Sequence, residues 1–277
     1  DRVAAPPSVD GVVNPVGAFD PFAPGSAATL ALFGARVGGM MLIAPSFSST
    51  IVPRTVRVAL LVGFTMLLQP AALASVRGVP RLTAPAVLSE TLIGFAIGLG
   101  AAILIGAAET AGDVMAVQIG LSGSAILDPL NTTQTPALGT FTALFATVLL
   151  LSLNLHVVML GALADSTAAF PVGTPVSSSG GALAMLQLGG SLFSLGVRFA
   201  APVIAAVLIA NVALAALGRA APQLNVLWVS FPVQIAIGLF ALVAAIPAIG
   251  RFFGGWAGVS DGLLSHVVGA FTAAPIR

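Results

Sequence analysis

The residue whose type comes closest to catalytic chemistry is His156, which could in principle act as a general base. It stands in an apolar stretch, and Asn154 is its nearest polar neighbour. Serine and aspartate also occur in the chain, but no arrangement of them around this histidine forms a catalytic constellation. A hydrogen-bonded role in helix packing is therefore favoured over general-base catalysis.

Other kinds of chemistry lack the residues that they need. The chain has no Cys and only two His, which excludes thiolate metal sites and makes an imidazole zinc site a poor fit. It has no Lys, although a phosphate-binding P-loop requires one. The net charge of +1 gives no basis for a nucleic-acid surface. We therefore expect no enzyme activity, no cofactor, no metal and no nucleic-acid partner.

Glu109 and Asp113 are the most unusual pair of charges. Four positions separate them, so on a helix both carboxylates would share one face and repel each other by a few tenths of a kcal/mol. They stand between apolar segments, where a lipid-facing charge costs about 3 kcal/mol. They are therefore expected to face water, a lumen or a cationic partner, and an ordinary loop outside the membrane is the simple alternative.

The elements that must position these residues are membrane helices. Apolar residues make up 58% of the chain and charged residues 7%, with a mean hydropathy of +1.09. A soluble domain carries about 25% charged residues. Several intervals without any charge are long enough for a span of about 20 residues, and the apolar runs do not alternate as barrel strands do. The spans are expected near residues 27–45, 55–75, 85–106, 137–163, 183–218 and 226–249.

The chain is expected to divide into three parts. Residues 1–26, rich in Pro, Gly and Asp, are predicted to be a loose N-terminal extension. Residues 27–250 carry the apolar spans. Residues 251–277 form a tail with a short, weakly amphipathic stretch that could lie on a membrane surface.

Basic residues do not orient the second expected span. Arg54 and Arg57 precede it, and Arg77 and Arg81 follow it, so both ends look equally cytoplasmic. Either this span re-enters the membrane, or neighbouring subunits rather than the bilayer set its position.

Several short motifs follow one another along residues 30–250. They are Arg36-Val37-Gly38-Gly39, Ala44-Pro45, Val52-Pro53-Arg54, Glu90-Thr91-Leu92-Ile93-Gly94 with Gly98, Ala111-Gly112, Gln118-Ile119-Gly120, Asp128-Pro129, Asn154-Leu155-His156, Ser166, Phe170-Pro171, and Arg198…Pro202…Asn211…Gly218-Arg219-Ala220-Ala221-Pro222-Gln223-Leu224-Asn225 with Phe231-Pro232. In this order they resemble the FliR family of flagellar export proteins. Each motif is short, and their shared order makes the resemblance specific.

Two positions depart from the family pattern. Leu155 stands where the family usually has Gly, and Thr167 stands where an aromatic residue is common. These departures put the helix spacing near His156 in doubt. A sister family serves virulence-type injectisomes and shares much of the Pro-Gln-Leu-Asn region, but Asn154 and His156 favour the flagellar branch.

The resemblance implies an all-α membrane protein whose kinked helical hairpins form part of a closed, multi-subunit export gate. It implies FliP-like and FliQ-like subunits and an FlhB-like protein as partners, with membrane lipid around them and unfolded exported proteins as substrates. The implied location is the bacterial inner membrane at the flagellar basal body. A stand-alone multi-pass transporter of a small solute is the alternative, although no internal repeat or midplane polar cluster favours it.

The resemblance also places a plug for the closed portal near residues 106–123. The glycines there make a rigid helix unfavourable, since each interior Gly costs about 1 kcal/mol relative to Ala. We therefore expect a partly solvated loop that blocks the lumen, with Met115 and Ile119 as a deformable apolar seal. The residues assigned to it are Gly106, Glu109, Gly112, Asp113, Met115, Gln118, Ile119 and Gly120.

A second group of residues is assigned to packing between subunits. Arg36 and Arg198 lie within or beside apolar runs, where their charges could either snorkel to the interface or pair with another subunit. Pro222 breaks a helix, which exposes carbonyls for neighbouring side chains to bind. The residues of this group are Arg36, Arg198, Arg219, Pro222, Gln223 and Asn225.

Overall fold

The computed structural model describes residues 25–48, 52–76, 78–121, 137–174, 178–221, 223 and 226–272. All regular elements in these ranges are α-helices, which confirms the expected all-α class. The helices are α1 (Ser26–Ile43), α2 (Pro45–Ser48), α3 (Arg54–Leu67), α4 (Gln69–Ser75), α5 (Ala84–Ile119), α7 (Ala137–Ser152), α8 (Leu155–Ala169), α9 (Ser178–Ala220) and α10 (Val226–Thr272).

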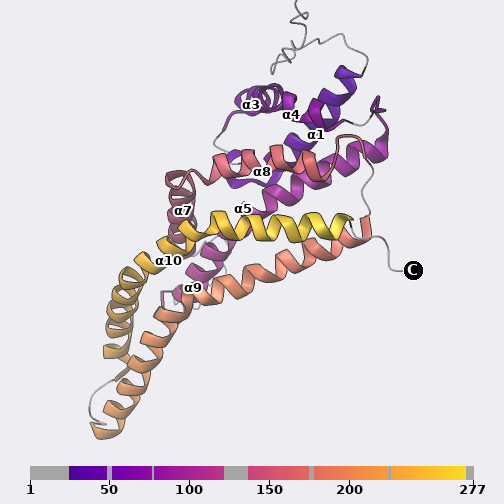
Figure 1. Cartoon of the computed structure of the whole chain (residues 1–277). Coiled ribbons are helices and arrows are strands. Elements are labelled where there is room, and N and C mark those ends of the chain that lie inside the picture. The colour runs from indigo at the N-terminus through magenta and orange to yellow at the C-terminus, as the bar shows by residue number, and fades with distance from the viewer. Residues whose placement is uncertain are drawn as a thin grey trace, which may run out of the picture.

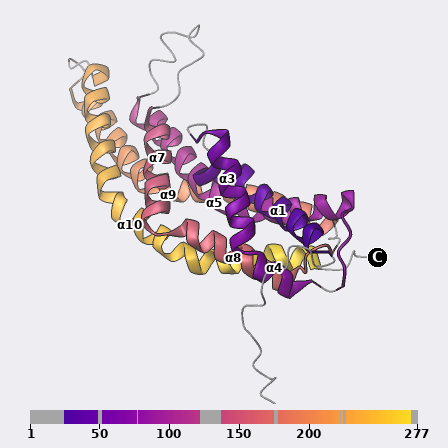
Figure 2. The same ribbon diagram turned by 90° about the horizontal axis from the view of Figure 1, so that it is seen from above.

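Helix α5 is the central element of the molecule. It runs diagonally between the other helices, with α1 packed on its first half and α7, α9 and α10 on its second half (Figure 1). Its apolar residues are distributed around the whole circumference, as expected for a helix covered on several sides. At the far end, α9 and α10 continue as a long hairpin beyond the other helices, and the view from above shows the same arm (Figure 2).

Glycines allow α1 and α5 to cross at backbone distance. A Cβ on Gly94 would overlap the backbone carbonyl of Arg36, and one on Gly39 would overlap that of Thr91. A Cβ on Gly98 would lie 2.6 Å from the carbonyl oxygen of Met40. These glycines are therefore required by the packing of the two helices, as in close helix pairs of membrane proteins.

Four helices are long and apolar enough to cross a membrane, and two bent pairs raise the number to as many as six in the described part of the chain. The expected span at 55–75 is the first bent pair, because α3 and α4 meet at 50°. The expected span at 137–163 is the second, because α7 and α8 meet at 66°. The fourth expected span is therefore bent at the junction of α7 and α8. Asn154 sits at the break with a φ of 55°, a left-handed conformation that Asn tolerates better than most residues.

The last two helices are longer than their expected spans. Helix α9 contains Pro202 and α10 contains Pro232 and Pro247, yet neither helix ends at a proline. Helix α10 also crosses residue 250, the expected start of the tail, without interruption. The membrane-surface role of the tail stays a prediction, and residues 1–24 of the expected extension lie outside the described residues.

Candidate functional site

The second half of α5 is a helix rather than the expected loop. Residues 106–119 continue α5 without a break, and Gly120 caps its end with a φ of 85°. The prediction of a loop was wrong because it weighed the intrinsic cost of each glycine without the packing of neighbouring helices, which overrides propensity.

Gly112 shows why glycine is tolerated inside this helix. A Cβ on Gly112 would overlap the hydroxyl of Thr142 and lie 2.7 Å from the carbonyl oxygen of Leu138. A Cβ on Gly139, in α7, would in turn overlap the carboxylate of Asp113. The two glycines therefore let α5 and α7 meet at backbone distance, and the contact places Asp113 against the first turns of α7.

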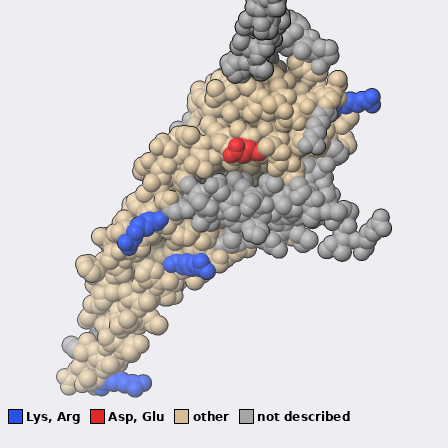
Figure 3. All heavy atoms as spheres, viewed as in Figure 1, with Lys and Arg blue, Asp and Glu red and all other residues tan. Residues whose placement is uncertain are grey.

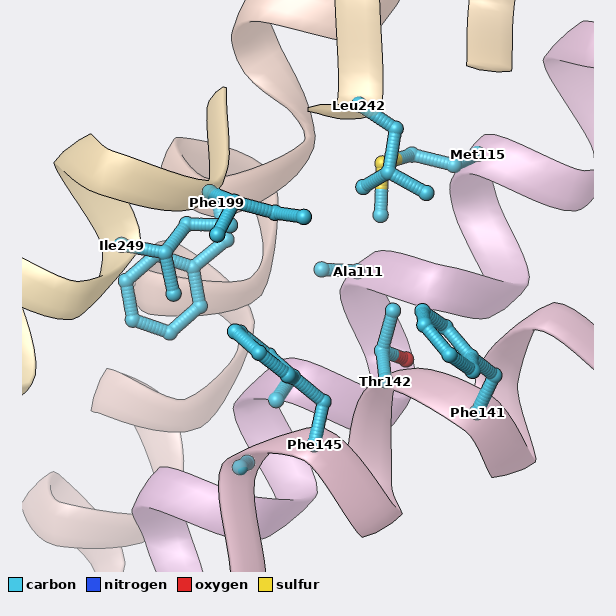
Figure 4. A pocket seen from close by; sticks show the side chains of 11 residues that line it. Ala111, Met115, Phe141, Thr142, Phe145, Phe199, Leu242 and Ile249 are labelled. Carbon is cyan, nitrogen blue, oxygen red and sulfur yellow. The ribbon is translucent and has the colours of Figure 1, made fainter. Parts of the chain in front are cut away.

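Met115 and Ile119 are buried in the core of this chain. Their side chains are 1% and 0% exposed, and Ile119 contacts the backbone position of Gly238 in α10. Met115 also lines a small apolar cavity of about 20 Å³ between α5, α7, α9 and α10, together with Phe145 and Phe199 (Figure 4). The hydroxyl of Thr142, which also lines it, donates to backbone carbonyls of α7, and the other lining residues are apolar, so the cavity is expected to stay dry. The expected seal residues therefore hold four helices together in this structure.

The opposite face of the same helix is open. Glu109 and Gln118 are exposed, Val117 is 65% exposed and Asp113 is partly exposed. The spacing of Glu109, Asp113 and Val117 by four residues puts them along one stripe. The segment thus has a packed face and a free face. The free face carries Glu109, and Asp113 lies at its border with α7.

Arg36 forms the main buried polar cluster that the structure describes. Its side chain is fully buried, and Nε donates a hydrogen bond to Glu90 across 2.6 Å. Nη1 donates to the hydroxyl of Ser166, and Nη2 donates to the backbone carbonyl of Phe170, both at 2.9 Å. Arg36 was expected to reach a lipid interface or another subunit, and the structure instead satisfies its charge inside the chain.

Glu90 extends this cluster to the turn after α8. One carboxylate oxygen pairs with Arg36, and the other accepts a hydrogen bond from the backbone N–H of Gly173 at 2.9 Å. Because buried charges are tolerated only when they are paired and hydrogen-bonded, this geometry ties α1, α5 and the end of α8 into one unit.

Glu90 was not among the assigned site residues, although the sequence carried a signal for it. It stands at the start of a long apolar run, and an ionisable residue in such a position is costly enough to need a named partner. The partner could not be read from the sequence, because 54 residues separate Glu90 from Arg36.

The other residues assigned to subunit packing lie away from this cluster. Arg198, Arg219 and Gln223 are exposed, and Pro222 and Asn225 lie outside the described residues. On the face shown in Figure 3, charged side chains are sparse among the described residues. The structure therefore leaves these exposed positions available to a neighbour and does not bring them together with Arg36.

An amide pair joins the two helices of the long hairpin. The side-chain N–H of Gln234, in α10, donates a hydrogen bond to the side-chain oxygen of Asn211, in α9, at 2.6 Å. Neither residue was assigned a role from the sequence beyond the motif that contains Asn211. The pair links α9 to α10 through their side chains.

His156 lies just after the break between α7 and α8 and is partly buried. Its Nδ1 atom is buried and has no hydrogen-bond partner within the described part of the chain. The expected hydrogen bond is therefore absent at this nitrogen. No group of three or more metal-ligating side chains was found among the residues that the structure describes.

Comparison with known proteins gives a consistent result over these helices. The family model described as "Bacterial export proteins, family 1" matches residues 27–257. The flagellar biosynthetic protein FliR of Escherichia coli K12 is 30% identical over 78% of this chain and 84% of its own length. The proteins of the same name from Caulobacter vibrioides and Aquifex aeolicus are 29% and 31% identical, and the matches cover 79% and 80% of this chain and 88% and 86% of theirs.

Proposed function

This chain belongs to the FliR family of bacterial export proteins, and we propose that it helps to form the portal of a type III protein export gate. It is a structural subunit of the export apparatus, and its substrates are unfolded flagellar proteins. The observation that carries this function is the match to the export family, which spans α1 to the middle of α10. Relatives named for flagellar biosynthesis favour the flagellar machine over the injectisome.

The surface of the long hairpin supports a role inside a larger assembly. Three of its large apolar side chains, Ile209, Trp228 and Phe240, are 70%, 78% and 77% exposed. They lie on helices long and apolar enough to cross a membrane, where exposed apolar side chains are covered by lipid or protein. We assign this cover to membrane lipid and to FliP-like and FliQ-like subunits, with an FlhB-like protein bound to the complex. The location that follows is the inner membrane at the flagellar basal body.

The free face of α5 is the part of this chain best suited to close the portal. Glu109 gives it a charge that must not face lipid, and Asp113 lies at its border with α7. Val117 and Gln118 extend the free face towards the helix end. On the packed face, Met115 and Ile119 are buried in the core, so the neighbouring helices hold this part of α5 in place. We assign the closing role to this free face, in place of a loop sealed by Met115 and Ile119.

Affinity purification of the chain in a mild detergent tests the assembly. The export function predicts that FliP-like and FliQ-like chains are recovered with it in one high-mass complex. A matched control is Arg81→Gln, which changes an exposed charge outside the hairpin and should leave recovery unchanged. A chain that runs alone or as a dimer, and that moves a small solute in vesicles, would favour the transporter and contradict the export gate.

A further inference from the structure

Two basic residues mark one level of the long hairpin, near the point where it leaves the other helices. Arg198 of α9 and Arg251 of α10 are both exposed. The residues that follow them are in contact, because the ring of Phe199 lies 5.1 Å from that of Phe252 and 6.0 Å from that of Phe253. Arg198 and Arg251 therefore lie at the same height along the hairpin.

A second level lies near the tip of the hairpin, where Arg219 and Trp228 are both exposed. The hydrogen bond between Asn211 and Gln234 shows that these two positions face each other across the hairpin. Arg219 follows Asn211 by about 12 Å of helix, and Trp228 precedes Gln234 by about 9 Å. Arg219 and Trp228 therefore lie at nearly the same height.

The distance between the two levels matches the thickness of a bilayer. With the usual helical rise, Arg198 and Arg219 lie about 32 Å apart, and Trp228 and Arg251 lie about 35 Å apart. The hydrocarbon core of a bilayer is about 30 Å thick. An arginine at its edge keeps the charged end among the headgroups, and tryptophan is enriched at the same depth.

The surface between the two levels carries no charge. No Asp, Glu, Lys or Arg occurs in residues 199–218 or 229–250, which we call the band. In the view of Figure 3, uncharged side chains cover the hairpin between basic groups near its base and at its tip. Ile209 and Phe240 lie close to the middle of the band on their respective helices, and both are largely exposed.

This composition favours lipid over a protein neighbour as the cover of the band. Even the interfaces of permanent homodimers are only about 65% apolar, and nothing limits them to the thickness of a bilayer. The side-chain amides of Asn211 and Gln234 bond each other, so they need no partner from outside the chain. The side of the hairpin towards α5 is excluded from this surface, because Ile119 packs there against Gly238.

We propose that bilayer lipid covers the outward surface of the band, with Arg198 and Arg251 at the headgroups of one leaflet and Arg219 and Trp228 at those of the other. The inference rests on the membrane location in the proposed function and not on the export role. A chain that purified without any export subunit would still have to show lipid along this surface.

Spin labels test the depth of the band, because the chain has no Cys and each label can occupy one new cysteine. Ile209→Cys and Phe240→Cys place labels at its middle, and Leu217→Cys places one at an exposed position close to the tip. The purified chain, with any subunits that co-purify, is reconstituted in equal amounts of phosphatidylethanolamine and phosphatidylglycerol. We expect the ratio of collisions with oxygen to collisions with a water-soluble nickel chelate to be several-fold higher at the two central positions than at Leu217.

Val207→Cys is the matched control for Ile209→Cys. Val207 lies at nearly the same depth but is 1% exposed, on the packed side of α9, so both reagents should collide with its label rarely. Equally rare collisions at Ile209 and Phe240 would show that a protein subunit covers the band. Frequent collisions with the nickel chelate there would show that water covers it. Either result would overturn the proposal.

Trp228 provides a second measurement that needs no label. With Trp256→Phe it becomes the only tryptophan of the chain. Lipids brominated close to the headgroup should quench its fluorescence more strongly than lipids brominated close to the end of the acyl chain, because tryptophan at the edge of the band lies among the headgroups. The reverse order, or no quenching by either lipid, would also overturn the proposal.

Discussion

Glu90 accepts a hydrogen bond from Nε of Arg36 across 2.6 Å, although 54 residues separate the two in sequence. Both side chains are fully buried, so this pair places two charges in the interior of the chain. Taking two charges out of water is costly, and the attraction between them offsets that cost only when further hydrogen bonds satisfy the remaining atoms. Ser166, the carbonyl of Phe170 and the N–H of Gly173 supply those bonds.

Removing one member of this pair should be far more damaging than removing both. We expect Glu90→Ala to lower the free energy of unfolding by about 3–5 kcal/mol, because it leaves the Arg36 guanidinium buried without its counterion. The double variant Arg36→Met with Glu90→Leu should recover much of that loss. Thermal unfolding of the purified chain in detergent measures both.

Glu109→Ala is the matched control for Glu90→Ala. It removes an exposed carboxylate from the same helix and should change the free energy of unfolding by less than about 0.5 kcal/mol. A loss in Glu90→Ala no larger than in this control would show that the buried pair does not hold α1 and α5 together.

A methyl group at Gly94 should separate α1 from α5. The Cβ of Gly94→Ala would overlap the backbone carbonyl of Arg36, and neither backbone can yield without moving a helix. We expect a loss of at least about 2 kcal/mol in unfolding free energy, within the range for overpacked cores. Gly100→Ala is the comparison on the same helix: it meets no atom within 4 Å and should be neutral or stabilising by up to about 1 kcal/mol. Equal effects in the two variants would contradict the close crossing.

The effect of substituting Asn154 on stability should depend on how well the new residue tolerates a left-handed backbone conformation, not on the size of its side chain. Asn154 has a φ of 55°, so Asn154→Ala is expected to cost about 1 kcal/mol and Asn154→Gly to cost nothing or less. Paired cysteines placed across the α7–α8 bend would report the angle by their cross-linking rate. Unchanged stability and cross-linking in Asn154→Ala would mean that neighbouring helices, not this residue, set the bend of 66°.

The amide pair of the long hairpin can be measured by a double-variant cycle. Asn211→Leu leaves the Gln234 amide without its partner, and Gln234→Leu does the same to Asn211. We expect a coupling of about 0.6 kcal/mol and at most about 1.7, which is the usual range for hydrogen bonds between membrane helices. Coupling close to zero would indicate that the pair does not fix the alignment of α9 and α10.

The sequence was sufficient for the class of the fold and for the positions of most spans, because a charge-free apolar interval of about 20 residues is typical of a membrane helix. It failed where packing overrides local preference. Judged from the sequence alone, Gly112 argues against a helix. The contact with Thr142 of α7 shows why glycine is needed at this position. Arg36 could not be placed for a similar reason, because its partner Glu90 comes from a distant segment. Contacts between remote segments are what a single sequence does not provide.

The last prediction concerns closure of the portal by the free face of α5. Deletion around Gly112–Gln118 is a poor test, because it would also remove Met115 from the core. Val117 is 65% exposed, so Val117→Ser changes the free face while leaving the packed face intact. We expect the assembled complex with this variant to leak potassium ions several-fold faster than the wild type. Leu88→Ser is the matched control, since Leu88 is 60% exposed near the start of the same helix and should not affect the leak. A membrane that stays tight around a fully assembled Val117→Ser complex would show that this face does not close the portal.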